Sequence, residues 1–394
     1  MGTFRNVSNA EHCPICSKPD WCSILTPDEP AYPGQELYVC RRIHTKEIQS
    51  NVNGKNYFLV KELPDSSCLY TDTEKKGRNK EVAQPYSFQK RKSLPLPDYG
   101  VPPLNNTELD KYYRAFLGML PLSKQHIRSL LNDGWTKELI CSSNIHTLRL
   151  KKTYSEEKGY YDDSTERFRI ASLLQEQFGT LKGVPGFYQD ASGNWTFVGK
   201  PGMLIPTYDI HGRLYRLRLR LDRPDTDENG KIKNKYKNFS SYYPQKDESG
   251  ALSNAFVCGC RSGSHTGFYY RPGIDDCSIC YITEGEKKAI VANHVLHTIV
   301  VSLPGVNSYK KLENQDNEIS ILEYLNQLGC KTAIIAYDAD KYINKFVMRH
   351  EKDLADLLKL NSFSTYIANW NPAFGKGLDD ILLLGIYPHL IPAM

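Results

Sequence analysis

The chain has 394 residues, of which 40% are hydrophobic and 24% charged, and its formal net charge is +5. This length accommodates two or three domains with the composition of a globular protein. No run of about eighteen apolar residues occurs, so no membrane span is expected. The first residues lack an apolar signal core, and eleven cysteines therefore predict reduced thiols and metal sites in a cytoplasmic protein. The small positive charge permits nucleic-acid binding but does not argue for it.

A group of cysteines near the N-terminus has the spacing of a metal site. A Cys-x-x-Cys pair places two thiolates on one tight turn, which suits tetrahedral zinc. Two later cysteines complete the set, although His12 or His44 can replace one of them. A small segment with few apolar residues gains much of its folding free energy from such a metal. We therefore predict a zinc ribbon over residues 1–63, with structural zinc held by Cys13, Cys16, Cys22 and Cys40.

A second group of cysteines leaves another zinc site open. Its later pair is separated from the earlier pair by predicted sheet and loop, and the last cysteine opens a predicted strand. This context favours unrelated free thiols over a second metal site for Cys258, Cys260, Cys277 and Cys280.

Residues 64–106 are polar and rich in Lys, Ser and Pro, which predicts an extended linker. The basic residues of this segment can contact a nucleic-acid backbone, but a solvated tether is the favoured role. Apolar residues then recur at helical spacing from residue 107, with further helices expected from Ser123 and over 165–178. These helices predict one face of an α+β domain that occupies residues 107–275.

The segment 214–221 alternates strictly between apolar and basic residues. Alternation predicts a strand with Tyr215 and three leucines on one face and three arginines on the other. The guanidinium groups would lie about 7 Å apart, twice the rise per residue, which is close to the spacing of phosphates along a nucleic acid. An arginine row is also ordinary on a solvated sheet face. The lack of an acidic partner favours phosphate binding by Arg216, Arg218 and Arg220.

Two predicted strands near the C-terminus end in carboxylates. Glu284 follows the strand around residue 282, and Asp338 and Asp340 follow the strand over 332–337. Helical patterns follow both strands, so residues 276–394 predict an α/β domain with a mainly parallel sheet. Active groups collect at the carboxyl ends of such strands. Three acids at one edge need a cation, and a hard ion such as magnesium is the natural occupant.

This pairing resembles the TOPRIM domain of topoisomerases, bacterial-type DNA primases and some nucleases. The resemblance runs from about residue 277 to the C-terminus and includes the acids of the segment 375–380, Asp379 and Asp380. It implies that both belong to the catalytic set and hold a second ion through water, although Asp380 can equally be a first-turn helix acid. The cysteine segment similarly resembles the zinc ribbon of primase-like replication proteins of mobile elements.

Residues 202–241 resemble the part of bacterial primases that precedes their TOPRIM half. The shared order is an Ile-Pro strand, a glycine turn, an arginine strand and a Lys-Tyr-x-Asn-x-Ser segment. This resemblance implies that the template and the incoming nucleotide face the basic side chains of Arg213, Arg216, Arg218, Arg220, Lys235 and Lys237. Lys376 can reach a phosphate from its glycine-flanked loop. Lys287 and Lys288 either hold phosphates or lie on a solvated helix face.

Together these features predict a primase-like nucleotidyltransferase that joins nucleoside triphosphates into short primers on single-stranded DNA for mobile-element replication. Magnesium or manganese would be bound by Glu284, Asp338 and Asp340. The chain has no Walker A motif, so a helicase would be a separate partner. Two alternatives stay open, namely a metal-dependent nuclease that uses the same acids and a non-catalytic DNA-binding replication initiator.

Overall fold

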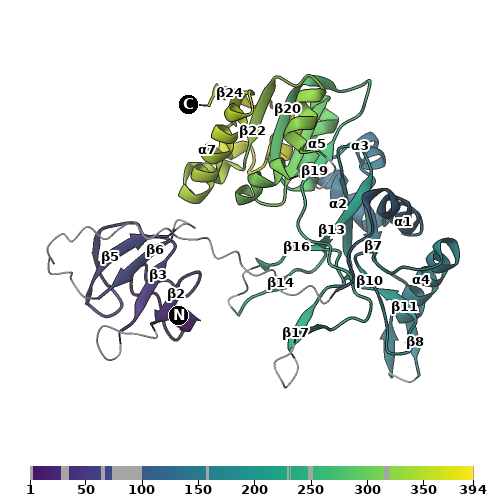
Figure 1. Cartoon of the computed structure of the whole chain (residues 1–394), viewed down its shortest axis with the longest axis horizontal. Coiled ribbons are helices and arrows are strands. Elements are labelled where there is room, and N and C mark those ends of the chain that lie inside the picture. The colour runs from purple at the N-terminus through teal and green to yellow at the C-terminus, as the bar shows by residue number, and fades with distance from the viewer. Residues whose placement is uncertain are drawn as a thin grey trace. The chain divides into compact units, whose positions relative to one another are not determined.

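The computed structural model describes residues 3–27, 35–63, 67–72, 100–156, 159–228, 230, 232–246, 252–314 and 319–393. The chain divides into two compact units, residues 1–91 and 92–394, which are described separately below (Figure 1). None of the helices in these described ranges combines the length and the apolar character needed to span a membrane.

The first unit contains an antiparallel sheet with the strand order β1-β2-β3-β6-β5-β4. Its strands are β1 (Thr3–Asn6), β2 (Ser23–Thr26), β3 (Leu37–Cys40), β4 (Glu47–Gln49), β5 (Asn56–Glu62) and β6 (Cys68–Thr71). Strand β6 lies where the sequence predicted a linker, and this is a correction. Cys68, Leu69 and Tyr70 are buried, and removing their apolar surface from water favours a strand inside the sheet. At the other end of the predicted linker, Leu104 N donates to Gly183 O at 2.9 Å, so this stretch packs on the second unit.

The second unit begins with helices around an antiparallel sheet of order β16-β13-β12-β7. The sheet strands are β7 (His146–Leu148), β12 (Gly202–Tyr208), β13 (Leu214–Leu221) and β16 (Tyr236–Asn238). The helices are α1 (Asn106–Gly118), α2 (Lys124–Asn132), α3 (Lys137–Ser142) and α4 (Ser164–Phe178). Ser123 caps α2 by accepting from His126 N, as the sequence predicted. Four hairpins extend from this region: β8–β9 (Thr153–Ser155, Tyr160–Asp162), β10–β11 (Phe187–Gln189, Trp195–Phe197), β14–β15 (Asp225–Thr226, Ile232–Lys233) and β17–β18 (Pro244–Lys246, Leu252–Asn254).

The predicted strand over 214–221 is present, but it carries a bulge. Thr207 on β12 pairs with Arg216, whereas Tyr208 pairs with Leu214, so Tyr215 is the extra residue. The bulge shifts the alternation there. Leu214 and Leu217 both enter the core under α1 and α4. The Tyr215 hydroxyl instead donates to Thr266 O at 2.6 Å, so this ring is not on the leucine face as expected.

The C-terminal part of this unit is a six-stranded sheet of order β19-β21-β20-β22-β23-β24. The strands are β19 (Gly267–Tyr269), β20 (Asp276–Glu284), β21 (Thr298–Leu303), β22 (Thr332–Ala336), β23 (Ser364–Asn369) and β24 (His389–Pro392). The central four run parallel, and the two outer strands are antiparallel. Its helical segments are α5 (Glu286–Leu296), η1 (Val306–Glu313), α6 (Ile321–Gln327), η2 (Ala339–Tyr342), α7 (Lys345–Leu360), η3 (Pro372–Phe374) and α8 (Leu378–Leu383).

Helices cover both faces of this sheet. One face packs on α5, α8 and β12 through residues such as Val291, Ile381 and Ile205. The other face packs on η1, α6 and α7. Because both faces are covered, the inner strands are apolar along their length, as β21 shows with all six residues buried. The mixed α/β architecture with a mainly parallel sheet therefore agrees with the sequence-based prediction.

Candidate active site and cysteine cluster

The carboxyl edge of the parallel sheet brings together the acids that end β20 and β22. Thr283 pairs with Ala336 across these two strands, so Glu284 and Asp338 leave the sheet at neighbouring strand ends. Lys288, one turn into α5, donates from Nζ to the Asp338 carboxylate. Burial alone would lower the pKa of Lys288, but Asp338 above all, and then Asp379 and Glu284, raise it above its ordinary value. Three carboxylates therefore act on one ammonium group.

Asp379 supplies the third acid from the first turn of α8. Its side chain is buried, at 8% exposure, and within the described ranges no hydrogen bond or ion pair holds its carboxylate. Burial raises the pKa of Asp379, and the charges of Asp380 and Asp338 add to this, against the effect of Lys288. A Cβ at Gly377 would lie 2.3 Å from Asp379 Oδ1 and 2.9 Å from Lys288 Cε, so a side chain at this position would displace the side chains of Asp379 and Lys288. An unpaired buried carboxylate is costly unless a cation joins it.

Asp380, predicted as a catalytic acid, has a different place. It is exposed, and its Oδ2 accepts from Lys376 N at 2.9 Å and Gly377 N at 2.8 Å. Asp380 thus caps the start of α8 and shapes the loop that carries Lys376. Lys376 Nζ in turn lies 3.4 Å from Asp338 Oδ2.

The Asp-x-Asp loop is anchored by a residue that the sequence analysis missed. The side chain of Asp340 lies outside the described part of the structure. The next residue, Lys341, is buried, and its Nζ donates to Glu351 Oε2 at 2.9 Å and Ala368 O at 2.8 Å. Burial lowers the pKa of Lys341, against the effect of Glu351. A lysine directly after the acidic motif was the only signal, and it does not distinguish a buried anchor from a solvated charge.

A pocket of about 150 Å³ opens beside these acids. Glu284 and Asp379 line it together with Arg218 and Tyr236 from the antiparallel sheet. Arg218 Nη1 lies 3.3 Å from Glu286 Oε1, and its guanidinium sits 5.8 Å from the Tyr236 ring centroid. Arg218 Nε is buried without a hydrogen-bond partner among the described residues. The pocket therefore combines acids able to hold a hard cation with an arginine able to contact a phosphate.

The other predicted phosphate ligands divide into two groups. Arg216 is buried, and its Nε and Nη1 donate to Ser262 O at 2.9 Å and Tyr215 O at 2.6 Å. Arg213 Nε is 2.8 Å from the buried Asp209 carboxylate. Burial of Arg216 argues against the expectation that it faces nucleic acid. Arg213 is partly exposed, and its role as a phosphate ligand stays a prediction.

The remaining basic residues lie nearer the pocket or the surface. Lys287 pairs with Asp133 at 2.9 Å. Lys237 and Lys200 both pair with Asp225, each at 2.8 Å. Burial lowers the pKa of Lys235, and the nearby charges of Arg220 and Lys287 lower it further. The carboxylates of Asp133 and Asp379 act on this pKa in the opposite direction.

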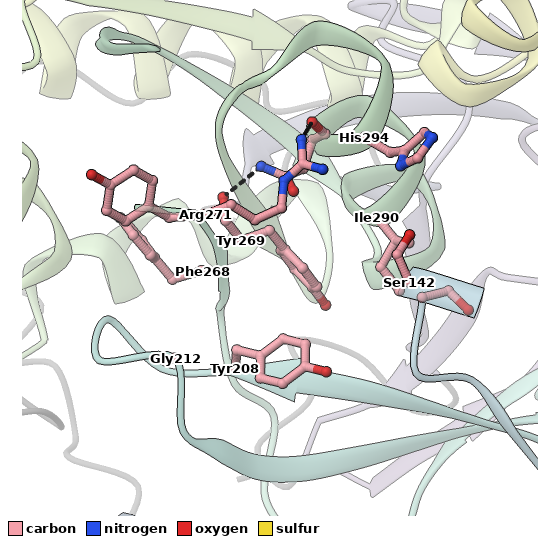
Figure 2. A pocket seen from close by; sticks show the side chains of 11 residues that line it. Ser142, Tyr208, Gly212, Phe268, Tyr269, Arg271, Ile290 and His294 are labelled. Carbon is pink, nitrogen blue, oxygen red and sulfur yellow. Dashed lines mark hydrogen bonds between the residues drawn. The ribbon is translucent and has the colours of Figure 1, made fainter. Parts of the chain in front are cut away.

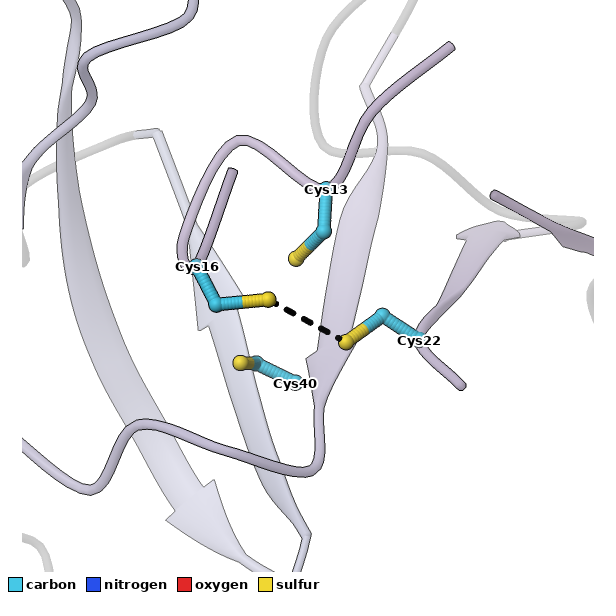
Figure 3. Close-up of side chains that lie close together, drawn as sticks. All are labelled: Cys13, Cys16, Cys22 and Cys40. Carbon is cyan, nitrogen blue, oxygen red and sulfur yellow. Dashed lines mark hydrogen bonds between the residues drawn. The ribbon is translucent and has the colours of Figure 1, made fainter. Parts of the chain in front are cut away.

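The first unit contains the predicted cysteine cluster (Figure 3). The sulfur atoms of Cys13, Cys16, Cys22 and Cys40 all lie within 4.8 Å of one another, and those of Cys16 and Cys22 are 3.6 Å apart. Four thiolates bound at about 2.3 Å to one tetrahedral zinc would lie about 3.8 Å apart. The donor set and spacing therefore fit zinc, and both histidine alternatives fall away because His44 Nδ1 instead lies 3.3 Å from Cys68 Sγ and His12 is not in the group.

Contacts among the four thiols divide their pKa values. Hydrogen bonds from neighbouring thiols, Cys13 first, lower the pKa of Cys16 well below its ordinary value and that of Cys22 to about 7, whereas the same contacts raise the pKa of Cys13 and of Cys40. Arg42 Nη1 lies 3.8 Å from Cys16 Sγ, and Asp20 Oδ1 holds the same guanidinium at 2.8 Å. Such an outer arginine orients and stabilises metal-bound thiolates.

A second cysteine group is absent from the described ranges. Cys258 donates to Gln189 Oε1 at 3.2 Å, and Cys277 Sγ lies 3.1 Å from the Tyr270 hydroxyl, so these thiols have separate partners.

A pocket of about 220 Å³ lies near the C-terminal end of α5 (Figure 2). There Arg271 Nη2 donates to Asn293 O at 2.9 Å and contacts Asp275 at 3.0 Å, so this guanidinium supports the helix end.

Fold and site together define an α/β protein with an acidic strand-end pocket and a separate four-cysteine cluster. A family model described as a domain of unknown function (DUF3854) matches residues 272–385, less than a third of the chain. Comparison with curated proteins finds no match.

Three solved structures illustrate the structural likeness. The RNA polymerase domain of Mycobacterium tuberculosis primase DnaG has 11% identity and a TM-score of 0.47, with 73% of this chain and 84% of that chain covered. The zinc-binding and RNA polymerase domains of the Aquifex aeolicus primase give 13% and 0.45, with 73% and 63% covered. A DnaG primase catalytic domain bound to single-stranded DNA gives 13% and 0.42, with 70% and 76% covered. These values are too low to carry a functional inference, which therefore depends on the site itself.

Proposed function

We propose that the chain is a primase-like nucleotidyltransferase that joins nucleoside triphosphates into short primers on single-stranded DNA. The observation that carries this proposal is the buried, unpaired carboxylate of Asp379, which shares a pocket with Glu284 and Arg218. An unpaired acid next to an arginine suits a site that takes a divalent cation together with a phosphate. The sequence order of the acidic motifs and of the Lys-Tyr-x-Asn-x-Ser segment supports synthesis on a template.

The residues of the pocket divide the work as follows under this proposal. Glu284, Asp338, Asp340 and Asp379 would hold magnesium or manganese, which would neutralise charge developing on the α-phosphate. Lys288 holds the Asp338 carboxylate in place until the cation binds. Lys288 and Lys376 then turn to phosphate oxygens, and Arg218 positions the nucleotide from the facing sheet. The zinc-binding first unit would contact the template, and a separate helicase would expose it during replication of a mobile element.

One observation favours a second candidate, metal-independent nucleic-acid binding. Lys288 and Lys376 already neutralise Asp338, and in the described ranges no three acids approach one another within 4.8 Å. A protein of this kind would bind DNA through Lys288, Lys376 and Arg218 without chemistry.

A single assay separates the candidates. The intact protein is incubated with single-stranded DNA, magnesium and labelled ribonucleotides. New oligomers support the proposal, a shortened template indicates a nuclease, and neither product indicates binding alone. Asp338→Asn should reduce synthesis at least about a hundredfold, because removing one preorganised charged group from such a site typically costs this much. Asp356→Asn, an exposed aspartate on α7, is the matched control and should retain wild-type synthesis.

A further inference from the structure

A larger pocket, of about 470 Å³, lies beside β16 and is separate from the candidate active site. Residues of α4, of the β10–β11 hairpin and of the segment that follows β16 line it, including Arg167, Tyr188, Lys237 and Tyr243. No residue that lines this larger pocket also lines the acidic pocket. The catalytic roles proposed above make no use of it.

The two pockets use mainly opposite faces of the same pair of strands, although Asn238, which pairs with Arg218, also lines the larger pocket. Successive side chains of a strand point to opposite faces. Arg218 and Tyr236 line the acidic pocket, whereas Leu219 and Lys237, which pair directly across β13 and β16, line the larger one. Strand β16 is an edge strand of its sheet. A flexible chain leaving the acidic pocket can therefore pass around the edge strand β16 toward the larger pocket.

Aromatic rings form much of the wall of the larger pocket. Tyr243 is 65% exposed. The rings of Tyr188 and Phe256 lie 4.4 Å apart between centroids. The Arg261 guanidinium sits 5.6 Å from the Tyr242 ring centroid. Exposed flat rings of this kind are the surfaces on which unpaired bases stack.

Positive charge accompanies the rings. Lys200 and Lys237 both lie 2.8 Å from the carboxylate of Asp225, which leaves one ammonium charge uncompensated. Arg167 is held by the Asp163 carboxylate at 2.8 Å and donates to the carbonyls of Phe197 and Gly199, so this arginine stabilises the wall of the pocket. The two lysines are therefore the groups available to a phosphate.

We infer that this pocket binds single-stranded nucleic acid, with an unpaired base stacked on Tyr243 and a neighbouring phosphate held by Lys200 and Lys237. A duplex would hide its base faces from the rings, and an acidic peptide would use the lysines but leave the rings without a flat partner. The inference shares its class of ligand with the proposed function but places the contact on the far face of the sheet. It gives the template a second anchor away from the acids.

The test is fluorescence anisotropy with the intact, zinc-loaded protein, a labelled oligodeoxythymidine and no added magnesium. Tyr243→Ala should weaken binding at least about fivefold, the lower end for loss of one stacked base. Tyr243→Phe should retain the affinity, because it keeps the ring. Lys237→Gln should reduce the slope of log affinity against log salt by about 0.7, the share of one phosphate contact on a single strand.

Tyr387→Ala is the matched control, because Tyr387 is 64% exposed and lines neither pocket. Lys182→Gln, another exposed lysine, is the control for charge. Equal affinity of Tyr243→Ala and Tyr387→Ala would overturn the inference, as would no measurable binding by the wild-type protein. If synthesis is never detected but binding still depends on Tyr243, the proposed function fails while this inference stands. If synthesis is intact and Tyr243 is without effect, the inference alone fails.

Discussion

Asp379 is the residue whose surroundings argue most directly for a cation. Its carboxylate is buried at the N-terminus of a short helix, beside Lys288 but not paired with it. Burial has raised its pKa, so the ionised form destabilises the folded state more than the unfolded one. The protein tolerates this charge at a place where the loop is already tightened by Gly377. Such a local cost is typical of functional sites.

We predict that Asp379→Asn stabilises the protein and removes its response to magnesium. Because the pKa of Asp379 is raised in the folded state, its charge costs stability above the folded pKa and costs nothing below the unfolded pKa. The variant should therefore have a Tm a few degrees above wild type at neutral pH, and the difference should vanish at acid pH. Magnesium should raise the Tm of the wild type only. Thermal denaturation across pH checks both, with Asp356→Asn as control; a Tm lowered at neutral pH would contradict the reading of Asp379.

The sequence could predict the acids but not their neighbours. Glu284 and Asp338 could be predicted because each follows an apolar run that reads as a parallel strand, and acids at such strand ends meet at one edge of the sheet. Lys288 was open between phosphate ligand and solvated helix face, and its contact with Asp338 depends on the angle at which α5 packs on the sheet. Burial of Lys341 likewise depends on Glu351 from another helix. Pairings across elements of this kind carry no local sequence signal.

At the scale of the element, β13 shows that three arginines in one strand pattern have different roles. Arg216 lies under the segment 262–266, where its guanidinium satisfies two carbonyls. Arg218 reaches the acidic pocket, and Arg220 is partly exposed near Lys235 and Lys287. Alternation fixes which side of a strand a residue occupies, but not which parts of that side another segment covers.

We predict that Arg216→Ala and Arg220→Ala separate stability from binding. Loss of Arg216 removes a donor from the buried carbonyls of Tyr215 and Ser262, although His265 Nε2 still contacts Ser262 O. A buried acceptor left unsatisfied costs about 1–3 kcal/mol, so the Tm of the variant should fall. Its salt slope for single-stranded DNA should match wild type, because it contacts no phosphate. Arg220→Ala should keep its Tm, bind DNA more weakly and show a reduced salt slope. Thermal denaturation and anisotropy on both variants decide this; a stable Arg216→Ala with weakened binding would restore the original expectation of an arginine row.

The periodicity of apolar residues predicted most of the helices and strands of the second unit. Strand β13 has the predicted bounds, because apolar and basic residues alternate over the whole of this segment. Strand β6 was missed because Cys68-Leu69-Tyr70 is a short apolar run in a polar, proline-rich stretch. The bulge at Tyr215 was missed because it arises from the register in which β13 pairs with β12, and this register is not visible in the sequence of β13 alone. Short and paired features of this kind are set by tertiary contacts.

At the scale of the whole molecule, the hydrophobic cores indicate two separate folding units. The core around Ile24, Tyr57 and Tyr70 contains only residues of the first unit, and three of its members are cluster cysteines. The three cores of the second unit contain no residue before Leu104. The antiparallel and parallel sheets of the second unit share one of these cores, through Met203, Tyr281 and Val291. We therefore expect them to unfold together.

Removing zinc should unfold the first unit and leave the second unit folded. Its core is small, and a sheet of short strands rarely remains stable alone, so metal binding supplies much of the folding free energy. Hydrogen–deuterium exchange with a zinc chelator should show loss of amide protection in residues 3–72 and unchanged protection in residues 100–393. The pair Cys13→Ser and Cys16→Ser should have the same effect without chelator, whereas Cys141→Ser, at an exposed free thiol, should have none. Retained protection over β2 and β3 after complete metal removal would show that the cysteine cluster is dispensable for folding. Loss of protection extending into α5 would show instead that the two units depend on each other, which the separation of their cores argues against.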